Sequence, residues 1–285
     1  MVGVLLSGRF TFCEARNHLL TTVHTLASGS SGNALVCSCG DTHLLIDAGI
    51  SCRRITTALR ELGLALDDLT AILITHTHTD HIGGLQTLVK HCGVPLYGSG
   101  QTIRGLCYRM AGLEDRVREL PFGAVQELGG CAVTAFPTSH DAPGACGFRI
   151  DTTDGGVGIL TDTGYVTDEA AEVLPGVALA VLETNHDIEA LRSGPYPYYL
   201  KQRILGAEGH LCNEDAARFA VTLANAGASE LVLAHLSQEN NTPAMAQTVV
   251  ETALSAAGLA PALSVAPRDR LGPTHTVCRR AVCRK

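Results

Sequence analysis

The chain has 285 residues, with 28 acidic and 21 basic side chains, a formal net charge of −7, 12 His and 11 Cys. With 46% hydrophobic and 17% charged residues, it can bury a sizeable core, so the composition excludes a disordered chain. The acidic balance excludes a generally basic nucleic-acid coat, although bound divalent metals could supply local positive charge to an acidic substrate. The longest apolar run, 177–182, has six residues, and no membrane span is predicted.

The first 22 residues do not resemble a secretory signal. Their apolar stretch, 2–6, is short, contains a Gly and follows no basic region. We expect a loosely ordered extension, or a start codon assigned too early, and a cytoplasmic protein. The scattered cysteines contain no C-x-x-C pair, which indicates reduced, mostly buried thiols rather than a disulfide framework or a zinc knuckle.

Short apolar runs and helical patterns alternate along the chain without a linker. A helical pattern at 56–62 ends at Gly63, another covers 85–91, and Asn213 and Thr242–Pro243 are helix N-terminal signals. This alternation predicts one α/β domain of packed layers over 23–260. The predicted strands are 23–26, 34–38, 43–47, 71–74, 133–136, 157–160, 179–182 and 231–234.

The segment 261–285 carries the densest group of basic residues in the chain, five Arg and one Lys. Such a cluster could contact phosphates, but lone charge clusters are usually solvated. We therefore expect a basic, frayed tail.

A dense group of potential metal ligands follows the predicted strand 71–74. Three imidazoles and one carboxylate stand within six residues: His76, His78, Asp80 and His81. On a strand, His76 and His78 would face the same side, and after a turn Asp80 and His81 could reach a second point. Imidazole and carboxylate together suit Zn, Mn or Fe. The spacing therefore favours two divalent metals; the alternative is a polar loop rich in histidine.

Three further potential ligands come directly after predicted strands: His140, Asp162 and His235. Strand ends are where catalytic groups gather on α/β scaffolds. Each residue alone could equally belong to an ordinary turn. Together with the histidine cluster they bring the ligands to seven, a number that suits two metals sharing one bridging carboxylate.

This pattern resembles the metallo-β-lactamase superfamily, whose hallmark H-x-H-x-D-H is present at 76–81. Asp47, at the end of the predicted strand 43–47, matches the early acidic position of that superfamily. His140, Asp162 and His235 match its later ligands in order and approximate spacing. The resemblance covers about 23–257 and implies an α/β fold: a four-layer αβ/βα sandwich of two mixed sheets flanked by helices, with the metals in a cleft at one edge.

Segments away from the histidines resemble the YycJ-type branch, also called VicX-like or WalJ-type. This resemblance implies a cytoplasmic bacterial phosphodiesterase with 5′-to-3′ exonuclease activity on DNA. Members of the branch usually begin near Val23, which leaves residues 1–22 unaccounted for. The segments that carry the resemblance are 27–33, 45–49, 136–141, 161–165, 183–187, 194–197, 200–204, 209–213 and 233–237.

The resemblance also implies a role for each ligand. One metal would bind His76, His78 and His140, the other would bind Asp80, His81 and His235, and Asp162 would bridge both. Asp47 would orient a ligand histidine from behind. A hydroxide between the metals would attack phosphorus, which makes Asp80 part of the catalytic set as well.

A leaving alkoxide needs a proton, and His210 and His186 are the candidate acids. Asn213 is predicted to open a helix whose N-terminus could hold a phosphate near His210. Glu183 could hold His186 in place. Either histidine could instead be structural. The remaining histidines lack ligand partners in sequence and are predicted to be structural or surface residues: His18, His24, His43, His91 and His275.

Two segments could contact a nucleic-acid substrate. Lys201 and Arg203 lie near Tyr196 and the pair 198–199, a combination that could bind a single strand by stacking and phosphate contacts. The same pattern also suits a helix with snorkelling cations and half-buried rings. A Gly-punctuated loop could cradle a phosphate, although such loops are usually only turns; its polar residues are Ser28, Ser30, Ser31 and Asn33.

The sequence leaves three functions open. The first is a two-metal phosphodiesterase with DNA as its partner, which the YycJ-like segments favour. The second is an ester, thioester, lactone or β-lactam hydrolase on the same scaffold, since one scaffold hosts many reactions. The third is a non-catalytic binding protein, which the presence of all seven ligands disfavours. The ligand types accept Zn, Mn or Fe and do not choose among them.

Overall fold

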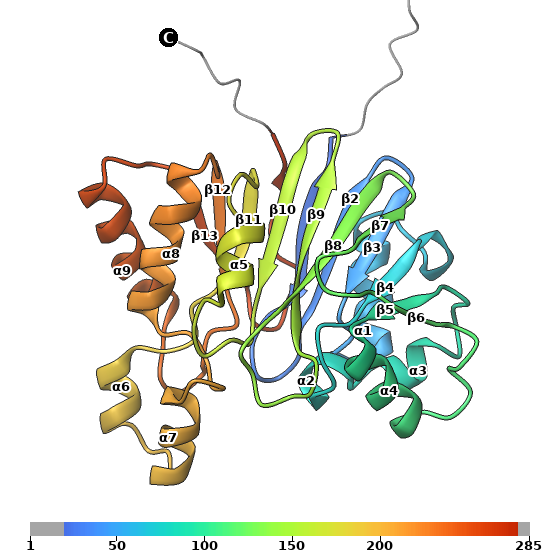
Figure 1. Ribbon diagram of the computed structural model, residues 1–285, viewed down its shortest axis with the longest axis horizontal. Coiled ribbons are helices and arrows are strands. Elements are labelled where there is room, and N and C mark those ends of the chain that lie inside the picture. The colour runs from blue at the N-terminus through green and yellow to red at the C-terminus, as the bar shows by residue number, and fades with distance from the viewer. Residues whose placement is uncertain (1–19, 279–285) are drawn as a thin grey trace, which may run out of the picture.

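Two mixed sheets of seven strands each lie face to face in the computed structural model, which describes residues 20–278 (Figure 1). Most of the extension predicted at 1–22, namely residues 1–19 with His18, therefore lies outside the described residues. Helices cover the two outer faces, so the four-layer sandwich implied by the sequence is confirmed. None of the described helices is long and apolar enough to cross a membrane.

The first sheet runs in the order β14-β1-β2-β3-β4-β5-β6. The strands β14 to β3 pair antiparallel, and β3 to β6 pair parallel. Its strands are β1 (Thr22–Ala27), β2 (Ala34–Cys39), β3 (Thr42–Ile46), β4 (Ala71–Leu73), β5 (Leu96–Gly98), β6 (Val117–Glu119) and β14 (His275–Thr276).

The second sheet runs in the order β13-β12-β11-β10-β9-β8-β7. Here β7 to β10 form an antiparallel meander, and β10 to β13 pair parallel. Its strands are β7 (Val125–Leu128), β8 (Cys131–Pro137), β9 (Cys146–Thr152), β10 (Gly155–Leu160), β11 (Leu179–Glu183), β12 (Glu230–Ala234) and β13 (Ala262–Val265).

Three buried apolar clusters hold the layers together. One lies between the sheets and includes Leu44 and Phe148. Another joins α1, α3 and α4 to the first sheet through Ile55 and its neighbours, and the third joins α5, α8 and α9 to the second sheet. The helices are α1 (Cys52–Glu61), α2 (Thr79–Ile82), α3 (Leu85–Leu88), α4 (Gly100–Arg109), α5 (Asp168–Val173), α6 (Ile188–Ser193), α7 (Tyr198–Leu205), α8 (Asn213–Asn225) and α9 (Pro243–Ala256), with a short 3₁₀ turn at Leu66–Asp68.

Every predicted strand is present, because the apolar side chains of each run are buried against the other sheet or against the outer helices. The N-terminal signal at Thr242–Pro243 is confirmed, since Thr242 Oγ1 accepts a hydrogen bond from the Met245 N–H at 3.2 Å. The signal at Asn213 is wrong by one residue: Cys212 is the N-cap. Asn213 is buried in the first turn, where its side chain pairs with Asn241.

The segment predicted as a frayed tail contributes to both sheets. Residues 262–265 form β13 beside β12, and 275–276 form β14 beside β1. His275 also pairs with Glu230 at 2.6 Å. Chain pairing at both sheet edges thus extends the packed fold to residue 277, and the basic residues from 279 onward lie outside the described part of the chain.

A close backbone contact at Gly49 fixes the loops that carry several site residues. The Gly49 N–H donates to Asn33 O at 2.8 Å, and the Asn33 N–H donates to Asp80 O at 2.7 Å. A Cβ at position 49 would lie 1.6 Å from Asp80 O and 2.7 Å from Asn33 N. Only glycine fits here, because both opposing groups are backbone and cannot move aside independently.

We predict that Gly49→Ala lowers the free energy of unfolding by about 2 kcal/mol or more, because overpacking forces the backbone apart. Gly93→Ala is the matched control, since a Cβ there meets nothing within 4 Å and should cost less than about 0.5 kcal/mol. Urea denaturation of both variants measures the difference. If the two variants had equal free energies of unfolding, the close contact at Gly49 would not contribute to stability.

Candidate metal centre

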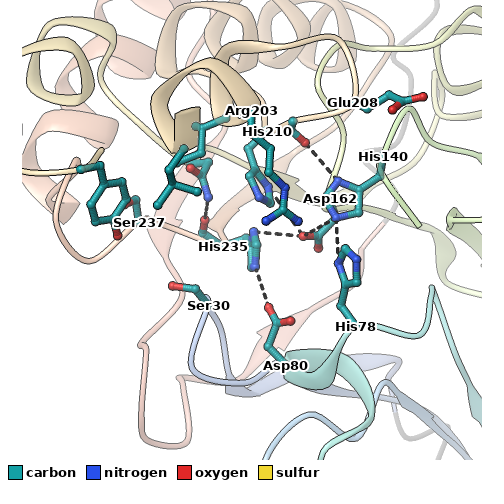
Figure 2. Close-up of a pocket in the computed structure, with 15 residues that line it drawn as sticks. Ser30, His78, Asp80, His140, Asp162, Arg203, Glu208, His210, His235 and Ser237 are labelled. Atoms are coloured by element: carbon teal, nitrogen blue, oxygen red, sulfur yellow. Dashed lines mark hydrogen bonds and ion pairs between the residues drawn. The ribbon is translucent and has the colours of Figure 1, made fainter. Parts of the chain in front are cut away.

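The predicted ligands meet at one edge of the sandwich, although they come from distant parts of the chain. His76 and His78 follow β4, Asp80 and His81 belong to α2, and His140, Asp162 and His235 follow β8, β10 and β12. Figure 2 shows His78, His140, Asp162, His235 and Asp80 around a common centre. They line a cavity of about 240 Å³, which is completed by His210 and helix α7.

Three of these positions lie on sharply turned backbone. Asp47, Asp162 and His235 have positive φ angles of 60°, 57° and 57°. They are the only non-glycine residues with positive φ in the described chain. A left-handed backbone at a non-glycine residue is strained and collects at functional sites. Each of these residues follows a strand end, and its left-handed backbone directs a polar side chain toward the shared edge.

The seven predicted ligands form groups with converging donor atoms. Within each group, the donor atoms all lie within 4.8 Å of one another. His76, His78 and His140 form one group, and Asp80, His81 and His235 form another. Asp162 belongs to two further groups, with His76 and His81 on one side and with Glu183, His210 and His235 on the other. Asp162 thus lies between the two predicted sets.

Buried hydrogen bonds fix His81 and His76 from behind. Asp47 Oδ2 lies 2.7 Å from His81 Nδ1 and accepts a hydrogen bond from Thr75 Oγ1 at 2.8 Å. Thr75 Oγ1 is also 3.0 Å from His76 Nδ1. The second nitrogen of each ring therefore faces the other ligands, which is the arrangement that orients metal-binding imidazoles. His140 is held in the same way by Gly209 O, 3.1 Å from its Nδ1.

Glu183 orients two other histidines, and this differs from the predicted role. Its Oε1 lies 2.8 Å from His210 Nδ1 and 2.9 Å from His235 Nδ1, while Oε2 accepts the Thr163 N–H at 2.8 Å. The sequence suggested His186 as its partner. Adjacency along the chain misled that expectation, because neither ring nitrogen of His186 hydrogen-bonds to the described residues, whereas His210 and His235 reach the carboxylate from other elements.

The buried carboxylates are held ionised by the surrounding imidazoles. Burial would raise the pKa of Asp162, but His235 and His81 keep it well below the usual carboxyl range. Burial would likewise raise the pKa of Glu183, but His210 lowers it to about 2. Both side chains are almost completely buried. Their negative charge therefore requires positive charge within the same pocket.

The pKa values of the buried histidines shift in opposite directions. Burial lowers the pKa of His76 well below its ordinary value. Burial acts the same way on His81, but Asp162 and Asp47 together raise its pKa well above the ordinary value. The pKa of His235 rises to about 10 despite burial, chiefly because of Asp162. In the absence of ions, protonated imidazoles thus neutralise the carboxylates.

The donor set fits divalent metal ions. His76 Nε2 is buried and makes no hydrogen bond to the described residues, and buried His235 Nε2 has only Asp80 Oδ2 at 3.6 Å. A buried nitrogen without a partner costs free energy unless a cation uses its lone pair. Imidazole nitrogens and carboxylate oxygens are the ligands that Zn, Mn and Fe accept. The geometry and the charge of the pocket therefore both match divalent metal binding.

The two candidate acids occupy different environments. His210 lines the cavity, with its Nδ1 held by Glu183. His186 is 1% exposed, does not line the cavity and has neither ring nitrogen hydrogen-bonded to a described residue. Burial lowers its pKa to about 4. His186 is therefore neutral and does not line the cavity, so the cavity geometry favours His210 as the acid.

The Gly-punctuated loop between β1 and β2 uses most of its polar groups internally. Ser28 Oγ accepts the His235 N–H at 2.8 Å. Asn33 Oδ1 accepts the Gly29 N–H at 2.8 Å, and its Nδ2 lies 3.0 Å from His81 Nε2. Ser30 lines the cavity, whereas Ser31 is exposed and does not. The loop therefore supports the ligands, and of its four predicted phosphate contacts only Ser30 reaches the cavity.

Several site residues were not identified from the sequence. Thr75 bridges Asp47 and His76, and Asn185 lines the cavity while donating to His235 O at 2.9 Å. Asp141, next to His140, accepts a hydrogen bond from Arg203 Nε at 2.5 Å. The adjacency of Thr75 to His76 and of Asp141 to His140 was the available signal, because residues beside ligands often orient them.

Comparisons with known proteins identify the family of this chain. Residues 42–236 match the family model described as "Beta-lactamase superfamily domain". The chain is 38% identical over 237 residues to exodeoxyribonuclease WalJ of Streptococcus pneumoniae serotype 2, covering 82% of this chain and 88% of that protein. It is 36% identical over 234 residues to exodeoxyribonuclease YycJ of Bacillus anthracis, covering 82% and 89%.

The fold comparison points the same way. The metallo-beta-lactamase fold protein YhfI of Bacillus subtilis superposes with a TM-score of 0.65 at 21% identity, covering 88% of this chain and 99% of that one. This likeness concerns the fold, and the sequence identity to WalJ and YycJ defines the family. The chain therefore belongs to the beta-lactamase superfamily and, within it, to the family of the WalJ and YycJ exodeoxyribonucleases.

Proposed function

We propose that this chain is a metal-dependent phosphodiesterase that degrades DNA from its 5′ ends. The observation that carries the proposal is the convergence of seven His and Asp side chains, five of which line one cavity, in a chain 38% identical to an exodeoxyribonuclease over 82% of its length. DNA is then the substrate, and the cytoplasmic location expected from the sequence stays a prediction.

The proposed ligand assignment follows the observed groups. His76, His78 and His140 would hold one ion, Asp80, His81 and His235 the other, and Asp162 would reach both. When bound, the ions would activate water as a nucleophile and neutralise charge on the phosphoryl oxygens. The ligand types suit Zn, Mn or Fe.

The chain's own side chains would orient the ligands and the proton donor. Asp47 fixes the ring of His81, and the Gly209 carbonyl fixes that of His140. Glu183 holds Nδ1 of His210, so Nε2 is the atom that can give a proton to the leaving oxygen. His210 thus serves as the acid in this proposal, and its place in the cavity wall supports the role.

The proposal predicts early release of the 5′ label from a linear duplex labelled separately at each 5′ and 3′ end. Mn or Zn is added, and product length is followed on a denaturing gel. His78→Ala is the control, because it removes a proposed ligand while leaving the buried core intact. We expect that variant to be slower by at least about 100-fold, since disturbing even the residues around a metal costs 10- to 100-fold.

Two outcomes would reject parts of this proposal. Early release of the 3′ label would reverse the polarity and leave the phosphodiesterase assignment standing. The second outcome is that DNA is not cleaved with either metal, although ions are bound and a thioester or lactone is hydrolysed rapidly. That result would favour an ester, thioester or lactone hydrolase over a phosphodiesterase.

His210→Ala tests the proton donor. We expect DNA turnover to fall by about 10²- to 10⁴-fold, the usual contribution of an acid, without loss of bound metal. Turnover of bis-p-nitrophenyl phosphate should fall much less, because p-nitrophenolate leaves without a proton. The ratio of the two rates and the metal content are measured together. An equal loss on both substrates would assign His210 a structural or metal-binding role.

A further inference from the structure

Helix α7 forms one wall of the metal cavity but contributes none of the proposed ligands. Tyr196, Leu200, Arg203 and Ile204 line the cavity from this side. The helix belongs to an excursion between β11 and β12, and Figure 1 shows α6 and α7 extending beyond the end of the second sheet. This wall is therefore available for substrate.

The spacing of these residues defines which face of the helix meets the cavity. Leu200, Arg203 and Ile204 stand three and four residues apart, so they share one face. Tyr196 lies just before the helix and completes the same wall. Tyr198 points to the opposite side, because two residues at about 100° each separate it from Leu200. Its side chain is 77% exposed and does not line the cavity.

Arg203 brings the positive charge of this wall toward the histidines. Among the described residues that line the cavity, it is the only Lys or Arg. Its Nε donates to Asp141 Oδ2 at 2.5 Å, and Asp141 Oδ1 lies 3.4 Å from His78 Nε2. The Arg203 side chain is 56% exposed, so a phosphate can reach it. Its planar fork matches phosphate oxygens, whereas the acidic Glu208 nearby would repel them.

Tyr196 and Leu200 add an aromatic and an apolar side chain to the same cavity lining as that cation. Stacking on tyrosine with a cation on the backbone is how proteins hold single strands without reading their sequence. A base within a duplex has its faces covered by its neighbours, so a base that stacks on Tyr196 would have to be unpaired. We propose that Tyr196 and Arg203 form a binding site for a single DNA strand, with Tyr196 stacked on a base and Arg203 on a phosphate. This inference rests on the proposed function.

Binding of oligothymidylate and of a fully abasic strand of equal length tests the stacking contact. Fluorescence anisotropy is measured in the His78→Ala background, where cleavage is slow. We expect oligothymidylate to bind at least about fivefold more tightly than the abasic strand. Tyr196→Ala should bring that ratio close to one, and Tyr196→Phe should retain it. Tyr198→Ala is the matched control on the opposite face of the same helix and should retain it as well.

Arg203→Gln tests the phosphate contact through salt dependence. Losing one contact to a single strand should reduce the slope of log affinity against log salt by about 0.7. Asp141→Asn breaks the same ion pair but keeps the cation, so the slope should stay unchanged. If the ion pair had only a structural role, Arg203→Gln and Asp141→Asn would change the salt slope by the same amount.

Three results would overturn the inference: no binding of either strand, an unchanged base-to-abasic ratio in Tyr196→Ala, or an unchanged salt slope in Arg203→Gln. The labelled duplex judges the proposed function separately. DNA cleavage by a chain that shows any of these results would leave the nuclease standing and remove only the strand site on α7.

Discussion

Buried negative charge at one edge of the sandwich is the constraint on which the site depends. Asp47, Asp162 and Glu183 are 3%, 2% and 0% exposed. Removing one ion from water costs several kcal/mol unless an opposite charge and hydrogen bonds compensate. At least one imidazole lies against each of the three carboxylates, and the donor groups around Asp162 and Glu183 could hold divalent cations. The same buried negative charge makes the cavity suitable for metals, which can activate water and bind phosphate.

The scaffold holds these charges in place at the cost of local strain. The parallel parts of both sheets deliver strand ends to one edge, and left-handed turns at Asp47, Asp162 and His235 then direct their side chains inward. Gly49 lets the loops around Asn33 and Asp80 approach within hydrogen-bond distance. Packing on both faces of each sheet keeps these turns from relaxing.

The sequence predicted the architecture and the ligands more fully than the contacts among them. Apolar runs identify strands because burial dictates their composition, and the spacing of His76 to His81 reports local geometry. The partners of Glu183 and the burial of His186 depend on where separate strands meet, which local spacing does not encode. The strands at 262–265 and 275–276 were missed because pairing across the whole chain, rather than local hydrophobicity, holds them in the sheets.

Metal-linked stability tests most directly the claim that buried carboxylates make this pocket a cation site. Mn or Zn at 100 times its dissociation constant should raise the free energy of unfolding of metal-depleted protein by about 2.7 kcal/mol per site. Asp162→Asn should lose most of that gain, whereas Asp67→Asn, at an exposed position on the 3₁₀ turn, should keep it. Urea denaturation with and without metal would contradict the account if the wild-type chain gained no stability, or if Asp162→Asn gained as much.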